Sequence, residues 1–105
     1  MRRRRRYLLF ALHSDVYVRE DELRQAVTNA VSLLMGESRP RVFRLISFDS
    51  ENRLGILRCD LRYVDAVRSA LLCLSAIVGS PAAIWILKMS GTIKSLRKTA
   101  TPSFI

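Results

Sequence analysis

The residue types that most often carry catalysis are scarce in this sequence and poorly spaced for it. His13 is the only histidine, so it would have to serve as the base for any serine or cysteine nucleophile. Its place beside the end of an expected strand favours a surface or capping role instead. The acids Glu20, Asp21 and Glu22 fall where a helix is expected to begin, and there they favour the helix dipole. The sequence therefore predicts no self-contained active site.

Metal and cofactor sites are equally hard to assemble. Cys59 and Cys73 are the only cysteines, and with one histidine they cannot supply the four ligands of a structural zinc ion. We expect two buried, reduced thiols. No Gly-rich loop could hold a nucleotide phosphate, because the four glycines are isolated: Gly36, Gly55, Gly79 and Gly91. We expect the protein itself to bind no cofactor.

Charge is the strongest signal for function. The 105 residues carry 18 Lys and Arg against nine Asp and Glu, a net charge of +9. All nine acids lie between Asp15 and Asp65, whereas bases crowd both ends of the chain. The terminal bases are Arg2, Arg3, Arg4, Arg5, Arg6, Lys88, Lys94, Arg97 and Lys98. A neutral body with two basic ends points to a polyanionic partner.

Length and hydrophobic periodicity predict one α+β domain over residues 1–105, with a basic arm at 1–6 and a flexible tail at 99–105. Strands are expected at 6–13, 42–48, 53–59 and 83–89, and helices at 21–35, from Asp60 to Gly79, and at 93–98. The uncharged stretch 69–87 approaches the length of a membrane span, but Gly79, Ser80 and Pro81 interrupt it, so we expect none.

The order βαββαβ predicts a ferredoxin-like (RNA-recognition-like) two-layer sandwich with a four-stranded antiparallel sheet and a short C-terminal helix. In this fold the last strand runs antiparallel beside the first. The start of the first strand then sits next to the end of the last one. We therefore expect the two basic ends to meet at one edge of the sheet.

The first strand is apolar on both faces, which is unusual for a sheet with helices on one side only. Leu8, Phe10 and Leu12 can face the helices. Tyr7, Leu9 and Ala11 then form a second apolar face, which we expect to be a partner interface. A self-dimer, a protein partner or an added C-terminal helix would each cover it.

Base stacking by exposed aromatic residues is disfavoured as the mode of RNA binding. The expected strand 53–59 has no aromatic residue, and we interpret Trp85 as a core or interface residue. The remaining mode of RNA binding is recognition of the phosphate backbone of structured RNA by Arg and Lys. Ser90, Gly91 and Thr92 turn the chain into the short helix, with Thr92 or Ser90 as N-cap. Free N–H groups there, with Lys94, Arg97 and Lys98 nearby, predict a phosphate-binding cradle.

Three segments, in order and spread through nearly the whole chain, resemble the Pop-five family, the small protein subunit of archaeal and eukaryotic ribonuclease P. They are Arg5-Arg6-Tyr7-Leu8, Gly55-Ile56-Leu57-Arg58-Cys59 and Ser90-Gly91-Thr92-Ile93-Lys94-Ser95. The resemblance implies binding to the catalytic domain of ribonuclease P RNA and pairing with a larger TIM-barrel-like protein subunit. RNA with its bound magnesium ions would then remove the 5′ leader of precursor transfer RNA, and this protein would assist without cleaving.

The resemblance carries functional roles over to Arg5, Arg6, Tyr7, Gly91, Thr92, Ile93 and Lys94. Among these, we expect Ile93 to pin the short helix against the body and not to contact RNA. Two alternatives stay open: a protein-interaction or dimerisation module, and a generic structured-RNA-binding protein. The compact chain suits the archaeal form of the family, which would be cytoplasmic. A eukaryotic member would be nuclear or nucleolar, and the arginine block could then be a targeting signal.

Overall fold

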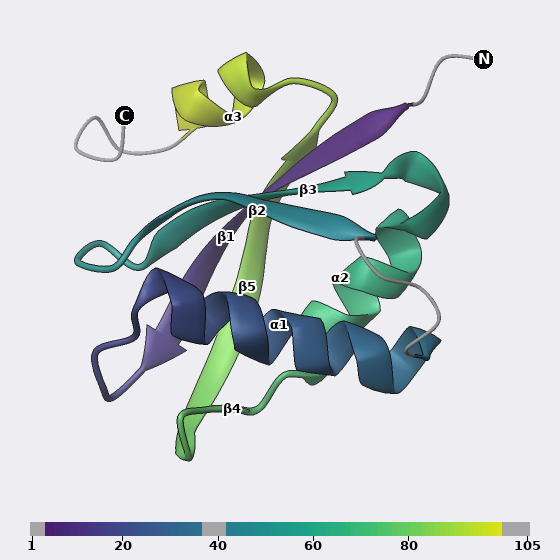
Figure 1. Cartoon of the computed structure of the whole chain (residues 1–105). Coiled ribbons are helices and arrows are strands. Elements are labelled where there is room, and N and C mark those ends of the chain that lie inside the picture. Colours follow the sequence, from purple (N-terminus) through teal and green to yellow (C-terminus); the bar gives the residue numbers. More distant parts are fainter. Residues whose placement is uncertain (1–3, 37–41, 100–105) are drawn as a thin grey trace.

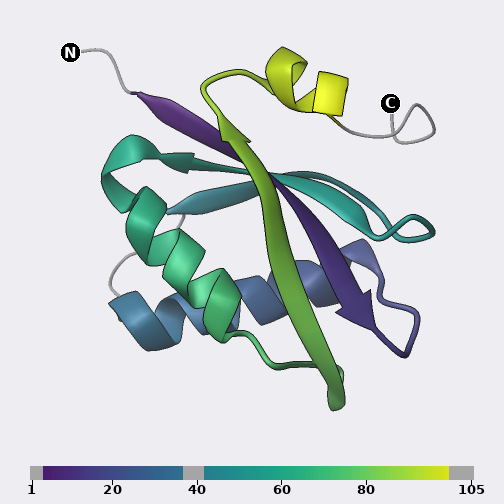
Figure 2. The same ribbon diagram turned by 180° about the vertical axis from the view of Figure 1, so that it is seen from behind.

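The computed structural model describes residues 4–36 and 42–99. Its elements are β1 (Arg5–Ser14), α1 (Glu20–Met35), β2 (Phe43–Asp49), β3 (Leu54–Asp60), η1 (Leu61–Tyr63), α2 (Val64–Cys73), β4 (Ala76–Ile77), β5 (Ser80–Ser90) and α3 (Ile93–Thr99). All strand pairs are antiparallel, in the order β2-β3-β1-β5-β4. Helices α1 and α2 cover one face of the sheet, and α3 lies across the other (Figures 1 and 2).

The predicted α+β class is correct, and the last long strand does lie antiparallel beside the first. The predicted four-stranded sheet is wrong in one detail, because β4 adds a fifth strand at the edge. The helix expected to run on to Gly79 ends at Cys73. Ala76 and Ile77 instead pair with Pro81 and Ser80.

The turn between β4 and β5 explains why the helical spacing of apolar residues predicted a helix that is too long. Ile77 reaches the core with 2% of its surface exposed, whereas Val78 is 63% exposed. Val78 and Gly79 have φ angles of 54° and 75°, the pair of positive values that a type I′ hairpin turn requires. The apolar spacing therefore continues past Cys73 through a strand that is too short to show a periodicity of its own.

Helix α1 follows its sequence signals closely. Its acids stand in the first turn, and the Arg19 N–H donates to Oε1 of Glu22 over 2.9 Å. Leu23, Val27 and Val31 are buried, as expected for one face of an amphipathic helix. Gly36, at φ 85°, ends the helix.

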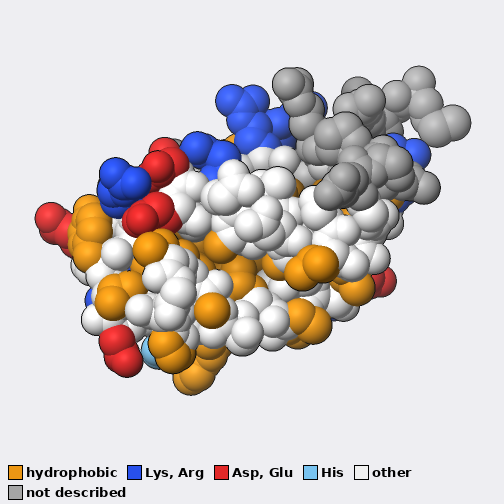
Figure 3. All heavy atoms as spheres, turned by 60° about the horizontal axis from the view of Figure 1, so that its bottom comes forward, with side chains coloured by type: hydrophobic (Ala, Val, Ile, Leu, Met, Phe, Trp, Pro, Cys, Tyr) orange, Lys and Arg blue, Asp and Glu red, His pale blue; other side chains and the backbone are white. Residues whose placement is uncertain are grey.

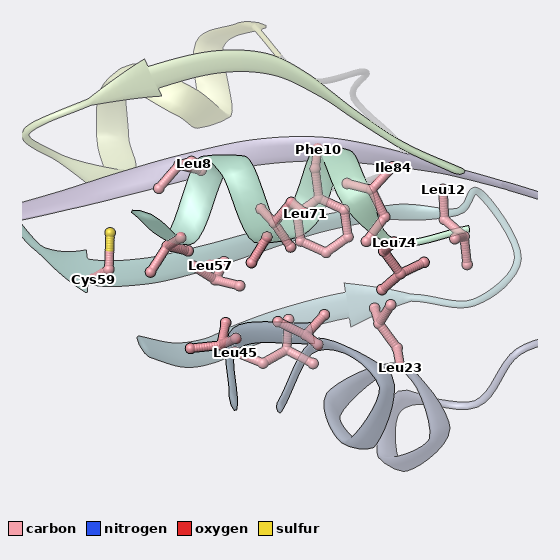
Figure 4. Packing of buried hydrophobic residues seen from close by; sticks show 14 of the residues in the cluster. Leu8, Phe10, Leu12, Leu23, Leu45, Leu57, Cys59, Leu71, Leu74 and Ile84 are labelled. Carbon is pink, nitrogen blue, oxygen red and sulfur yellow. The ribbon is translucent and has the colours of Figure 1, made fainter. Parts of the chain in front are cut away.

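The main core lies between the sheet and the pair α1 and α2, where Leu8, Phe10 and Leu12 point from β1 toward the helices (Figure 4). A second, smaller core lies on the opposite face of the sheet. There Leu9, Ile56 and Leu96 are each at most 1% exposed, with Ile93 packed against them. The C-terminal helix α3 therefore covers Leu9. Ile93 packs α3 against the body of the protein, as predicted.

Candidate nucleic-acid interface

The two ends of the described chain meet where β1 begins and β5 ends. Tyr7 pairs with Ser90, and Leu8 with Met89. The Nη1 atom of Arg6 lies 3.6 Å from the position that a Cβ atom on Gly91 would occupy. The predicted meeting of the basic ends is therefore correct in substance. At this end β1 lies between β3 and β5, and β5 is the edge strand of the described sheet, because β4 pairs only with Ser80 and Pro81 at the opposite end of β5.

The turn into α3 is held by its own hydroxyl groups. The Thr92 N–H donates to Oγ of Ser90 over 3.2 Å, and the Ser95 N–H donates to Oγ1 of Thr92 over 3.3 Å. Thr92 is thus the N-cap that the sequence suggested. These bonds already use two of the N–H groups expected to bind phosphate, so the exposed side chain of Lys94 becomes the main candidate for that contact.

A row of side chains that the sequence interpretation missed crosses the sheet next to this turn. We call the sheet face beneath α3 the outer face; Tyr7, Leu9 and Ala11 lie on it. The register places Arg44 of β2 opposite Arg58 of β3, Arg58 opposite Tyr7, and Tyr7 opposite Ser90. Paired residues share a face of the sheet, so Arg44, Arg58 and Tyr7 form one row.

The direct opposition of Arg44 and Arg58 has a cost. Like charges directly opposite each other on neighbouring strands are destabilising. No ion pair within the described residues relieves either arginine. An anion bound between them would remove the repulsion. The signal was present in the sequence, because both arginines interrupt strands that are otherwise mainly apolar, but it was masked by the larger charge blocks at the ends.

Ion pairing divides the bases of the described chain into two groups. The paired arginines lie at or near the helices: Arg19 with Asp21 and Glu22, Arg24 with Glu20, Arg62 with Asp60, and Arg68 with Asp65, at 3.3–3.6 Å. The bases of the sheet strands and of α3 that have described side chains make no such pair. They include Arg5, Arg6, Arg44, Arg58, Lys88 and Lys94. This second group is free to bind external anions.

Acids on the sheet are confined to two strand ends and are engaged locally. Asp49 accepts from the N–H groups of Glu51 and Asn52 and from Nδ2 of Asn52 at 2.7–3.2 Å. The bonds from Asn52 are the main cause that lowers the pKa of Asp49. Asp60 accepts from the Arg62 N–H at the start of η1. Neither β1 nor β5 contains an acid, so the outer face of these strands carries positive charge only.

Other predicted site residues have mixed outcomes. Arg4 and Arg5 are exposed at the start of β1, while Arg2, Arg3 and the side chains of Arg97 and Lys98 lie outside the described part. Among the expected partner residues, Tyr7 and Ala11 are half-buried. The choice of Leu9 is wrong, because its side chain is 0% exposed under α3 and offers no surface to another protein.

The thiols and the lone histidine contribute little chemistry. Cys59 is buried, and burial together with the Asp60 carboxylate raises the pKa of its thiol to about 11. A thiol is a poor nucleophile while it stays protonated. Cys73 is exposed, contrary to the prediction of two buried thiols. His13 is exposed, as expected. In the described ranges no three His, Cys, Asp or Glu side chains cluster as metal ligands, and no helix could span a membrane.

A second surface, on the helix side, exposes large apolar side chains beside polar ones that include Asp21, Glu22, Gln25 and Asn29. A shallow groove of about 730 Å³ runs between α1 and the segment from Cys73 to Val78. Leu33, which lines it, is 90% exposed, and nearby Leu72 and Val78 are 64% and 63% exposed. Figure 3 shows hydrophobic side chains spread over this face, with Lys and Arg gathered along its far border. Exposed apolar surface of this kind is typical of protein contacts.

The fold and these two surfaces define a small α+β protein with a five-stranded antiparallel sheet, a basic sheet side and exposed apolar side chains on the helix side. Residues 6–101 match the Rpp14/Pop5 family model, and the chain belongs to that family. It is 34% identical over 100 residues to ribonuclease P protein component 2 of Pyrococcus horikoshii, covering 93% of this chain and 83% of that protein. The same component of Pyrococcus furiosus is 35% identical over 106 residues, with 99% and 88% covered.

A solved structure has the same fold. A chain in the cryo-EM structure of yeast ribonuclease MRP superposes with a TM-score of 0.71 at 19% identity, covering 94% of this chain and 90% of that one. The family resemblance noted in the sequence is therefore correct.

Proposed function

We propose that this protein is a non-catalytic subunit of ribonuclease P that binds the catalytic RNA and thereby supports removal of the 5′ leader from precursor transfer RNA. The observation that carries the proposal is the opposed pair Arg44 and Arg58, which has no ion-pair partner among the described residues and lies in one row with Tyr7 and Ser90. Arg binds phosphate through a planar fork of donors, and two forks side by side suit an RNA backbone.

The chemistry of cleavage is assigned to the RNA with its magnesium ions. In the described residues the protein offers one exposed histidine, one buried thiol with a raised pKa and one exposed thiol. The protein's contribution is electrostatic, because positive side chains lower the repulsion between RNA segments that must come together. Such a subunit should matter most when magnesium, which also screens phosphates, is scarce.

We place the contact with the larger protein subunit on the groove beside α1, which Leu33 and Val78 line together with polar residues of the helix, in place of Leu9. The groove lies on the helix side, so its occupation leaves the basic outer face open to RNA. Leu33→Glu should weaken association with the larger subunit and leave the fold intact, since this side chain is 90% exposed. Leu87→Glu, the same change at a half-exposed position on β5, is the matched control. If only Leu87→Glu weakened association with the larger subunit, the contact would lie on the sheet and not in the groove.

The test of function is cleavage of precursor transfer RNA by reconstituted ribonuclease P RNA and the larger subunit at limiting magnesium. Adding this protein should raise the rate. Arg44→Gln with Arg58→Gln should remove most of the gain. Arg24→Gln with Arg68→Gln removes the same charge from the helix side, where both arginines have acid partners, and should keep the gain. If both double variants lost the rate gain equally, the arginine row would contribute only through the net charge of the protein. If the wild-type protein did not raise the cleavage rate, the proposal would be wrong.

A further inference from the structure

The single tryptophan of the chain is exposed on the outer face of the sheet. Trp85 pairs with Ala11 across β5 and β1, on the same face as Leu9 but beyond the small core that α3 covers. Its side chain is 58% exposed, so of the two expected roles, a core residue or an interface residue, the first is wrong. A large aromatic ring left in water on a sheet face is costly unless a ligand covers it.

A second ring supports Trp85 from one side. The centroid of His13 lies 4.3 Å from that of Trp85, with the ring planes inclined by 38°. His13 is paired with Ala83 and Trp85 with Ala11, so each large ring faces a small residue and the rings meet diagonally across the two strands. Diagonal neighbours on a sheet lie within reach of aromatic side chains. The pair fixes the indole and leaves the rest of its surface open.

Positive charge lies to one side of these rings, toward the end of β5, whereas the exposed Asp15 follows His13 by two residues just beyond β1. Lys88, opposite Leu9 on the same face, is exposed and forms no ion pair with any described residue. Three residues along a strand place it about 10 Å from Trp85. The row of Arg44 and Arg58 follows on the neighbouring strands. The small core of Leu9, Ile56 and Leu96 under α3 lies between this row and Lys88. Cations thus flank α3 on the outer face, and Lys88 is the one on the same strand as the exposed aromatic ring.

We propose that Trp85, backed by His13, stacks an unpaired RNA base while Lys88 and the arginine row bind the adjoining backbone. Stacking on aromatic rings along a positively charged groove is how proteins hold single-stranded RNA without reading its sequence. A protein surface is the weaker interpretation, because the other large exposed apolar side chains on the described strands β1 and β5 are Leu87 and Met89, and neither strand contains an acid. The inference deepens the proposed function, on which it rests for the identity of the RNA.

Because Trp85 is the only tryptophan, protein fluorescence reports on this site directly. Octauridylate should quench the emission as it binds. An abasic ribose-phosphate octamer of equal charge should bind through the cations without the same quenching. Binding is measured separately by the fluorescence anisotropy of a labelled strand. If octauridylate binds but the tryptophan emission does not change, stacking on Trp85 is excluded. If octauridylate does not bind at low salt, the proposal is also wrong. Neither result affects the cleavage assay, so failure here is distinct from failure of the proposed function.

Variants separate stacking from charge. Trp85→Ala should weaken octauridylate binding about 5- to 150-fold without changing its salt dependence, and Trp85→Phe should restore part of the loss. Leu87→Ala, an exposed apolar control on the same strand, should stay within about twofold of wild type. Thermal unfolding checks that each variant folds. If Trp85→Ala binds octauridylate normally but no longer associates with the larger subunit, the site is a protein interface and the proposal is wrong.

Discussion

The Phe10 ring lies directly over Gly55, so close that a Cβ atom at position 55 would overlap the ring. The two residues are paired across β1 and β3, and Gly55 is paired on its other side with Phe48 of β2. The Phe10 and Phe48 rings are nearly parallel, at 10°, with centroids 6.3 Å apart. Gly55 is therefore required for packing: it leaves room for a ring in the middle of the sheet.

Gly55→Ala should lower the free energy of unfolding by about 1–3 kcal/mol, the usual cost of overpacking a core. The added methyl group would force Phe10 out of its place between the sheet and the helices. Urea unfolding followed by circular dichroism measures the change. Gly91→Ala is the control, since a Cβ atom there meets Arg6 at an ordinary 3.6 Å. Equal stability of the two variants would show that the Phe10 ring can move at no cost.

Strand and helix order could be predicted because most elements are long enough to show a period. Leu23, Val27 and Val31 follow the helical repeat, and the apolar run of β1 is dense on both faces. The strand β4 has two residues and no period, so the pattern was extended through it. The strand forms because Val78 and Gly79 make a tight turn with positive φ angles. A valine in the sequence does not indicate a positive φ angle, so this turn could not be predicted.

The surfaces were harder to predict than the fold. Arg44 and Arg58 are 14 positions apart in the sequence and adjacent only once the register of β2 and β3 is known. The apolar second face of β1 was correctly recognised as covered, but hydrophobicity alone could not choose between α3 and another protein. Exposure of Trp85 likewise depends on how far along the sheet the short helix α3 extends.

Val78→Asn should stabilise the protein. A β-branched residue at φ 54° is strained, whereas Asn followed by Gly suits a type I′ turn. The valine is 63% exposed and loses little burial on replacement. We expect a gain of about 1 kcal/mol in the free energy of unfolding. Val78→Ala keeps a Cβ atom in the same backbone conformation and should gain less; a destabilised Val78→Asn would mean that the valine side chain contributes more packing than its exposure suggests.

Stability should fall in alkali because of Cys59. Burial raises the pKa of this thiol from 9.0 to about 11. Below pH 9 the thiol is protonated in both states, and between pH 9 and pH 11 the unfolded chain loses a proton that the folded protein keeps, so the free energy of unfolding falls. Cys59→Ala lacks this contribution. Its stability difference from wild type, measured by urea unfolding, should shrink between about pH 8 and pH 10.5. A constant difference would place the folded-state pKa at its ordinary value.

Arg44 should lower the stability of the free protein and strengthen its binding to RNA. It stands opposite Arg58 with no described acid to offset the repulsion, so Arg44→Gln should raise the free energy of unfolding by about 0.2–1 kcal/mol at low salt. The gain should vanish at about 1 M salt, where charges are screened within about 3 Å. The same variant should bind RNA more weakly and lower the log–log salt slope by about 0.7–0.9, the effect of losing one phosphate contact.

Arg24→Gln is the control for these two effects, because it removes a charge that is paired with Glu20 at 3.4 Å. It should lower stability slightly or leave it unchanged, since exposed ion pairs contribute about 0–1 kcal/mol, and it should leave the salt slope of RNA binding unaltered. If Arg44→Gln were less stable than wild type at low salt, the hydrocarbon part of Arg44 would outweigh the repulsion. The opposed arginines would then be a packing feature of β2 and β3, and their assignment as a phosphate site would depend on the salt slope alone.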